Sequence, residues 1–240
     1  NLGYLIEAAE FLEKALSYYG KRIPNNLLML SLKMLYGLGI YLFRIRFTSF
    51  MGRISPTERD NEIHELMYRM ANALTITDSG KFMKVATIYA PWYSRFRFKV
   101  PEILYITGAI FSYGGISFPI SRRIIDYISE NCDPGEEKSQ VLIGYLGIEN
   151  FMLEGPWGIQ PYDRDLVRRA LNLGDVHNMS LYIAFKAHEL LEMGKREAGL
   201  VLEELADMGE VYDSNYGRLA ALTHGTLYAY KFRELGRAIS

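Results

Sequence analysis

The sequence is poor in cysteine and proline and carries almost no net charge. Of its 240 residues one is cysteine, Cys132, eight are proline, and 27 Lys and Arg nearly balance 28 Asp and Glu. A single cysteine excludes an internal disulfide and a cysteine metal cluster, and a lone thiol favours a reducing compartment, so we expect a cytoplasmic protein. The balanced charge gives no general attraction to nucleic acid or anionic lipid, and we expect neither as a partner. With 49% hydrophobic residues the chain can bury a core, which excludes intrinsic disorder.

The sequence also lacks the spacings that are typical of catalytic and metal-binding residues. His64 and His188 each precede a glutamate, but neither has a second histidine four residues on, so the zinc-protease arrangement is missing. No sequence feature places a histidine beside Cys132, which favours a structural thiol over a nucleophile. Gly37 and Gly39 lack the lysine–serine ending of a phosphate loop and fit close packing or a helix stop. We therefore expect no catalytic residue, metal or cofactor, and a protein that is not an enzyme.

One apolar stretch, from Leu27 to Phe43, is a candidate membrane span. It is interrupted by Lys33 and is followed by Arg44 and Arg46. It is shorter than the roughly 20 apolar residues that a span needs. A charge at the centre of a span costs about 3 kcal/mol. We therefore expect a buried helix of a soluble protein instead.

Helical periodicity is abundant in this sequence. Apolar residues repeat at spacings of three and four, which predicts amphipathic helices. One stripe comprises Leu5, Ala8, Ala9, Leu12, Ala15, Leu16 and Tyr19, and another comprises Ala198, Val201, Leu202, Leu205 and Ala206. The run Ser55-Pro56-Thr57-Glu58 carries a capping hydroxyl, a first-turn proline and a carboxylate, which predicts a helix start. We expect about eleven helices, near residues 4–19, 24–47, 56–76, 80–97, 101–113, 117–131, 135–153, 162–173, 176–193, 195–211 and 214–235.

Glycine recurs where these helices should end. Gly115, Gly155, Gly194 and Gly236 follow one another at intervals of about 40 residues. Glycine at a helix C-terminus takes the left-handed conformation without steric cost. Near-equal spacing indicates that one supersecondary unit is repeated, which is typical of a solenoid.

Around these glycines the chain resembles tetratricopeptide repeats, which are helix-turn-helix units with small residues where two helices cross. In the run from residue 190 to 199 the first helix ends at Gly194 and the second starts at once. Gly199 and Ala206 would face the first helix, because small side chains let two backbones approach. The same geometry recurs at Gly3, Ala8 and Ala15, and the first-helix half recurs at Leu104, Gly108, Phe111 and Gly115. The repeats are nearer 40 residues than the usual 34, and the typical tryptophan and proline are missing.

The resemblance implies an all-α fold, a tetratricopeptide-like α-α superhelix or solenoid of antiparallel helix pairs. We expect a single helical-repeat domain over residues 1–240. Within it we expect a partial repeat at 1–20, an irregular helical segment at 21–100 and more regular repeats at 101–240. The chain starts without methionine and neither end reads as a polar cap, so we expect a fragment of a longer chain.

A narrower similarity concerns residues 15–24, Ala-Leu-Ser-Tyr-Tyr-Gly-Lys-Arg-Ile-Pro. A repeat that ends in glycine, a basic pair and proline, followed by a long apolar–basic helix, resembles the C-terminal helical region of large bacterial multidomain signalling ATPases. In that family the region follows a nucleotide-binding module and often precedes a cyclase, kinase or DNA-binding domain. The similarity implies a scaffold for signal transduction, through protein–protein interaction or intramolecular regulation.

The most unusual local segment is Pro-Trp-Tyr-Ser-Arg-Phe-Arg-Phe-Lys at residues 91–99. Alternating cations and aromatics suit a stacking platform for single-stranded nucleic acid. They equally suit a helix end whose aromatics anchor the core while its cations meet terminal carbonyls. No basic stripe continues elsewhere, which favours the second interpretation. If a partner binds, its anchors are expected at Trp92, Arg95 and Arg97, and at Trp157 in the run Gly-Pro-Trp-Gly.

Two functions of different class follow from this sequence. The first is binding of a protein or peptide partner, or of neighbouring domains of the same chain, in a groove between helices. The alternative is a small-molecule sensor with an apolar pocket between helices. A polar-rimmed groove would favour the first, and an enclosed apolar pocket the second. A helical enzyme would require His64, His188 and a carboxylate to converge in one cleft.

Overall fold

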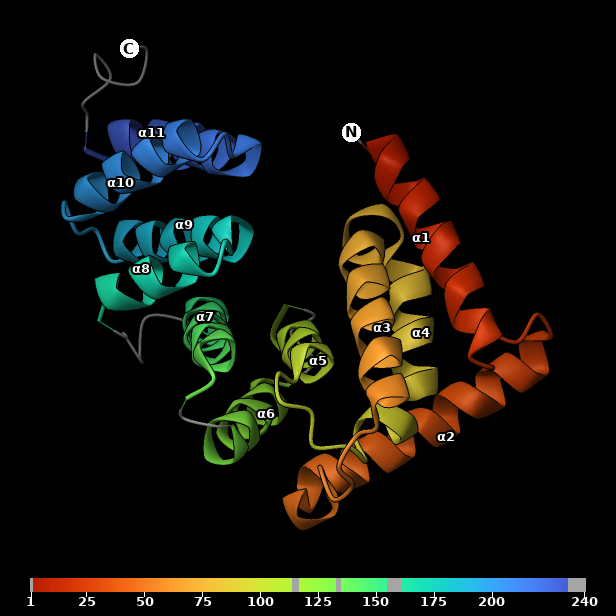
Figure 1. Ribbon diagram of the computed structural model, residues 1–240. Coiled ribbons are helices and arrows are strands. Elements are labelled where there is room, and N and C mark those ends of the chain that lie inside the picture. Colours follow the sequence, from red (N-terminus) through yellow and green to blue (C-terminus); the bar gives the residue numbers. More distant parts are fainter. Residues whose placement is uncertain (1, 114–116, 133–134, 155–160, 233–240) are drawn as a thin grey trace. The chain divides into compact units, whose positions relative to one another are not determined.

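The computed structural model describes residues 2–113, 117–132, 135–154 and 161–232 (Figure 1). Within these ranges the chain is helical and forms no strands, and the expected all-α class is confirmed. The helices are α1 (Leu2–Tyr18), α2 (Leu27–Arg46), α3 (Glu58–Thr77), α4 (Ser79–Tyr93), α5 (Glu102–Tyr113), α6 (Phe118–Asn131), α7 (Glu137–Glu154), α8 (Arg164–Asn172), α9 (Val176–Glu192), α10 (Ala198–Val211) and α11 (Asn215–Phe232), with a short 3-10 helix, η1 (Thr48–Phe50).

The eleven helices of the described residues match the eleven that periodicity predicts. Some begin or end at other residues than predicted, because local hydrogen bonds decide where a helix starts and stops. The cap of α3 is Thr57 and not Ser55: its hydroxyl accepts from the Asp60 amide at 3.2 Å, and its own amide donates to the Asp60 carboxylate at 3.0 Å. Such reciprocal bonds satisfy two amides that the helix leaves without partners.

Helix α4 ends at Tyr93, four residues before the predicted end near 97. The backbone beyond it pairs with the segment that precedes α3. The Ile54 amide donates to the Arg95 carbonyl at 3.0 Å, and the Arg97 amide donates to the Ile54 carbonyl at 2.9 Å. These bonds form an isolated parallel bridge between Ile54 and Phe96. Backbone groups committed to this bridge cannot continue a helix, which explains the early end.

The chain divides into two compact units, unit 1 (Asn1–Thr107) and unit 2 (Gly108–Ser240). In unit 1, α1 packs on α3, α2 packs on α4, and α3 packs on α4. The predicted α1 stripe is the sheltered side of that helix, with Ala9 and Leu16 buried. The core of the unit includes Met70, Leu74, Phe82, Val85 and Tyr93.

Gly37 sets the approach of α2 to α4. A Cβ atom at this position would overlap the carbonyl oxygen of Thr87. Pro91, inside α4, has no amide hydrogen to donate to that carbonyl, so the backbone of α2 can lie against it. The prediction that glycine serves close packing here is confirmed for Gly37, whereas Gly39 has open space around it.

The expectation of a buried helix at residues 27–43 is wrong for most of α2. Only Gly37, Tyr41 and Ile45 are buried, because they form the side that meets α4. The opposite side is apolar and exposed, with Leu28 and Leu35 about 70% accessible. In the described part of the chain, α2 is the one helix whose length and composition would allow it to cross a membrane. Its most apolar stretch has a mean hydropathy of 1.4, and 17% of that stretch is buried.

In unit 2 the helices pack in chain order. α6 contacts α7; α7 contacts α8 and α9; α9 contacts α10 and α11; and the pairs α8–α9 and α10–α11 also pack (Figure 1). Gly209 and Gly217 form the close point between α10 and α11, where a Cβ on Gly209 would lie 2.9 Å from the Arg218 amide nitrogen. Small residues therefore mark a helix crossing, as predicted, but at other positions.

The predicted crossing at Gly199 and Ala206 is wrong. Gly199 faces the Tyr228 ring of α11, where a Cβ would lie 3.1 Å from the ring, and Ala206 is exposed. The buried stripe of α10 continues from Leu205 to Met208 and Gly209, which are three and four residues further on. Seven residues are almost two helical turns, so Gly199 and Ala206 share one side of α10, but that side lies beside the buried stripe and not within it.

The turn at Gly194 is confirmed. Its φ of 68° is left-handed, and its amide donates to the Leu191 carbonyl while the Lys195 amide donates to the Leu190 carbonyl, both at 2.9 Å. This double closure is the Schellman motif, for which glycine is the favoured residue. The other three glycines of the 40-residue series, Gly115, Gly155 and Gly236, lie outside the described residues.

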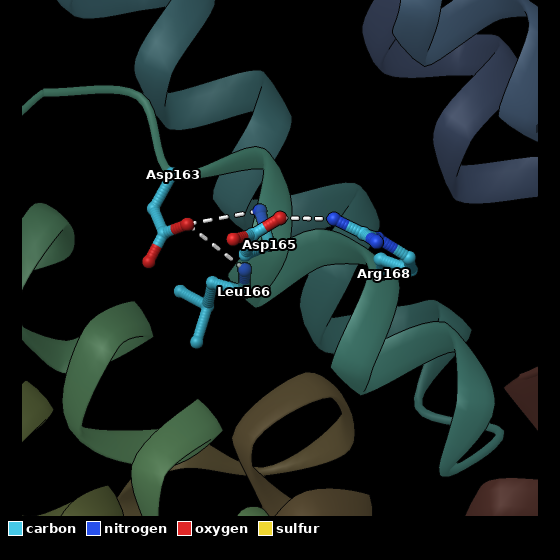
Figure 2. A network of polar contacts seen from close by, with 4 residues as sticks. All are labelled: Asp163, Asp165, Leu166 and Arg168. Atoms are coloured by element: carbon cyan, nitrogen blue, oxygen red, sulfur yellow. Dashed lines mark hydrogen bonds and ion pairs between the residues drawn. The ribbon is translucent and has the colours of Figure 1, made fainter.

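Helix α8 is short and depends on its cap, which Figure 2 shows. The Asp163 carboxylate accepts from the amides of Asp165 and Leu166 at 2.9 and 3.0 Å. Asp165 forms an ion pair with Arg168 one turn on. A carboxylate at the N-terminus satisfies two amides and complements the helix dipole, which starts the helix at Arg164.

Candidate functional site

The structure places three of the four predicted anchors close together in unit 1. Trp92 lies in the last turn of α4, and Arg95 and Arg97 lie in the bridge segment that follows. Trp157 belongs to residues 155–160, which lie outside the described residues.

Trp92 supports the segment and is itself partly covered. Its ring centroid lies 5.2 Å from that of Phe96 and 6.0 Å from that of Phe98. The Lys21 ammonium lies 4.2 Å from the Trp92 ring centroid, a cation–π contact. Burial, before any charge, lowers the pKa of Lys21 from its ordinary value. Trp92 therefore anchors this corner of unit 1 and is less available to a partner than predicted.

The aromatics of the 91–99 segment point inward. Phe96 and Phe98 are buried, and the Phe98 ring stacks on His64 with 3.9 Å between centroids. His64 Nδ1 lies 3.5 Å from the Glu102 carboxylate, and both side chains are buried. Arg95 and Arg97 are exposed. This arrangement, with rings in the core and cations outside, is the one expected for a helix end that anchors the core.

Beside this segment lies a cleft of about 330 Å³, which we call the arginine cleft. Three stretches of chain form it: the end of α2, the η1 turn with the residues after it, and the exit of α4. Its lining residues are Ile40, Phe43, Arg44, Phe50, Arg53, Ile54 and Arg95. The bridge between Ile54 and Phe96 holds the second and third stretches together.

Arg44 is fixed within the cleft. Its Nη1 donates to the Pro91 carbonyl and to the Ser94 hydroxyl, both at 2.7 Å. The Ser94 hydroxyl in turn donates to the Ala90 carbonyl at 2.5 Å. Arg44 thus satisfies one terminal carbonyl group of α4, that of Pro91, and ties α2 to this helix end. The sequence assigned this role to cations of the 91–99 segment.

Arg53 and Arg95 present their guanidinium groups to the cleft on aromatic supports. Arg53 Nε donates to the Ser49 carbonyl at 2.9 Å, and its guanidinium carbon lies 4.7 Å from the Phe50 ring centroid. The Arg95 guanidinium carbon lies 5.7 Å from the Phe96 ring centroid. The ring contacts orient both guanidinium groups before any ligand binds, and the hydrogen bond of Nε further fixes that of Arg53.

The cleft is cationic without compensation. No ion pair joins Arg44, Arg53 or Arg95 to a carboxylate of the described residues. Burial, and after it the positive charge of Arg95, lowers the pKa of Arg44. The guanidinium groups of Arg44 and Arg95 therefore repel each other, and an anion in the cleft would relieve that repulsion.

The arginine cleft, apart from Arg95, was missed by sequence reasoning. Its other cations come from residues 44 and 53, far along the chain from the bridge segment. A signal existed: Phe-Arg-Ile-Arg-Phe at 43–47 alternates aromatics and cations as residues 95–98 do. That run lacks a tryptophan, which makes the 91–99 segment the more conspicuous of the two.

His64 and His188, the two histidines that precede a glutamate, belong to different units of the chain. His64 pairs with Glu102 in unit 1, whereas His188 belongs to unit 2, where its ring contacts that of His224 edge-on at 5.5 Å. Within the described ranges no group of three or more His, Cys, Asp and Glu residues could hold a metal ion. The Cys132 sulfur accepts a hydrogen bond from the side-chain amide nitrogen of Gln140 at 3.2 Å.

A second, smaller cavity lies among the core residues of unit 1. It measures about 20 Å³ and is lined by ten residues of α3, α4 and α5, mostly apolar. That volume admits one water molecule and no organic ligand. Among its lining residues, the Tyr89 hydroxyl has no hydrogen-bond partner within the described part of the chain, and the Thr107 hydroxyl is bonded to the Tyr41 hydroxyl at 2.5 Å.

Comparison of the chain with protein-family models, with curated proteins and with solved structures finds no match.

Proposed function

We propose that this chain is a protein–protein interaction module or intramolecular regulatory scaffold, without chemistry of its own, within a multidomain signalling ATPase. The observation that carries the proposal is the arginine cleft, open to solvent at the end of an apolar helix side that nothing in the described structure covers. Its partner is a segment of another protein, or of a neighbouring domain, that combines apolar residues with acidic ones.

Charge complementarity favours such a segment. Helix α2 carries Lys33, Arg44 and Arg46 and no acidic residue, and the cleft adds Arg53 and Arg95. Arginine is enriched in binding hot spots, and an exposed apolar patch is typical of an interaction surface. An amphipathic helix could lay its apolar stripe along Leu28, Leu32 and Leu35 and place its acidic end in the cleft.

For the fold we propose the finer description of a tetratricopeptide-like α-α superhelix. The packing order of unit 2 supports it: alternate helices α7, α9 and α11 contact one another in sequence, and α8 and α10 pack between them. Helices α7 and α9 each contact both their successor and their second neighbour, as stacked helix pairs do. The Schellman turn at Gly194 joins one such pair.

The cavities favour a partner over a small-molecule sensor. An apolar ligand needs a pocket of several hundred cubic ångströms with apolar walls. The smaller cavity of unit 1 holds about 20 Å³, and the larger cleft is open and lined by three arginines. A cytoplasmic interaction module fits these dimensions better than a sensor for an apolar compound.

The proposal is tested with two fluorescent helical peptides that share one leucine stripe and differ only in their polar face, glutamate in one and lysine in the other. Fluorescence anisotropy should show binding of the acidic peptide and none of the basic one. The double substitution Arg53→Gln/Arg95→Gln should lower the affinity for the acidic peptide at least tenfold. The control Arg69→Gln/Arg168→Gln removes the same charge from exposed ion pairs elsewhere and should change nothing. Equal binding of the two peptides would refute the proposal.

A further inference from the structure

The chemistry of the arginine cleft specifies more than an acidic partner. Three guanidinium groups line a volume of about 330 Å³ and no carboxylate of the described residues pairs with them. A single carboxylate carries one charge and two oxygens, which suffice for one bidentate arginine. A phosphate monoester carries close to two charges and three acceptor oxygens. The count of arginines therefore matches a phosphate better than a carboxylate.

The unused donors of the cleft also suit a tetrahedral group. Arg44 spends Nη1 on the Pro91 carbonyl and the Ser94 hydroxyl and keeps Nε and Nη2. Arg53 spends Nε on the Ser49 carbonyl and keeps both Nη groups. Because each of these side chains is held by one nitrogen, it offers the others without a large loss of rotamer freedom.

The walls of the cleft indicate what carries the phosphate. Ile40, Phe43, Phe50 and Ile54 line it, and the Phe43 and Phe50 ring centroids lie 5.5 Å apart. Aromatic rings pack favourably on such walls in edge-to-face or offset geometry. The single methylene of a phosphoserine would leave these walls without contact, whereas the ring of a phosphotyrosine would cover them.

We propose that the arginine cleft binds an aromatic phosphate monoester, the side chain of a phosphotyrosine presented by the partner segment. Arg53 and Arg95 donate hydrogen bonds to the phosphate oxygens, and Arg44 adds a positive charge beside them. The tyrosine ring packs against Phe43 and Phe50. This inference rests on the proposed interaction function and names phosphotyrosine as the group that the same site binds.

The experiment uses the whole chain and three probes in isothermal titration calorimetry: N-acetyl-O-phosphotyrosine amide, N-acetyltyrosine amide and inorganic phosphate. The phosphotyrosine probe should bind at least tenfold more tightly than either of the others. Arg53→Gln and Arg95→Gln should each weaken it about tenfold, while Arg69→Gln should not. Phe50→Ala should abolish the advantage over inorganic phosphate. Thermal melts of each variant check that the fold is kept; Arg44 is left intact because it ties α2 to α4.

Several outcomes would overturn the inference. No binding of the phosphotyrosine probe, equal binding of inorganic phosphate, or unchanged affinity in the Arg53 and Arg95 variants would each do so. Arginine-dependent binding to phosphatidylglycerol vesicles, without binding of the phosphotyrosine probe, would make the cleft part of a membrane surface instead. Retained binding of the acidic helical peptide in the absence of phosphotyrosine binding would overturn this inference alone and leave the proposed function standing.

Discussion

The two units of the chain use the same helical elements in different ways. In unit 2, α7 and α9 each pack on their successor and on their second neighbour, and Gly209 and Gly217 bring α10 and α11 together. In unit 1, α1 packs on α3 and α2 on α4, so the pairing skips a helix. The skip leaves one side of α2 exposed and brings its C-terminal end to the exit of α4, where the arginine cleft forms. Serial packing buries apolar area, and the departure from it creates the candidate site.

The largest effect is expected at the buried ion pair of unit 2. Lys186 and Glu189 lie 2.5 Å apart in α9 and are 3% and 4% exposed. Lys186→Met would leave the Glu189 carboxylate buried without this cation and should cost about 3 kcal/mol of unfolding free energy. Urea denaturation at pH 7 measures it. The double substitution Lys186→Met/Glu189→Leu should recover most of the loss; a double variant as unstable as the single one would show that the loss is steric.

Next in size is the crossing of α2 and α4 in unit 1. Gly37→Ala places a Cβ on the Thr87 carbonyl and should cost about 2 kcal/mol through overpacking. Gly39→Ala, two residues on with open space around it, should stabilise the helix by about 0.5 kcal/mol. Chemical denaturation of the two variants gives the difference. Equal stabilities would mean that α2 does not rest on α4 through Gly37.

A smaller contrast separates two positions of α10. Gly209→Ala meets the backbone of α11 at Arg218 and should cost about 1 kcal/mol. Ala206→Leu lies on the exposed side and should change stability by less than about 0.5 kcal/mol. Thermal melts compare them. A larger loss for Ala206→Leu would restore the crossing at Gly199 and Ala206 that the repeat pattern predicts.

The smallest effect concerns pH. Burial first, then the charges of His224 and Lys231, lowers the pKa of His188, which Glu192 partly offsets. The unfolded chain therefore binds this proton more readily than the folded chain, and folding is favoured above the ordinary histidine pKa of about 6.5 and loses stability as the pH falls below it. Unit 2 should melt at lower temperature at pH 5.5 than at pH 7.5, and His188→Gln should reduce that difference. A melting temperature that rises on acidification would contradict the assignment.

Sequence patterns predicted the helices well because each depends on local spacing. The stripe of α1 and the turn at Gly194 are readable from the residues alone. The exposure of Leu28 and Leu35 could not be predicted from the sequence. Composition shows that a helix is apolar, but it does not show which other helix covers it. Nor could the arginine cleft be predicted: Arg44, Arg53 and Arg95 meet only because Gly37 admits α4 and Ile54 pairs with the backbone of 95–97. Such contacts between distant segments leave no periodic signal.

We propose that the chain binds its partner through unit 1, at the arginine cleft. Hydrogen–deuterium exchange of the whole chain can be compared with and without the acidic helical peptide. We expect added protection at residues 27–54 and 91–97 and none at residues 176–232. Protection confined to α9, α10 and α11 would move the binding surface to unit 2 and contradict this proposal.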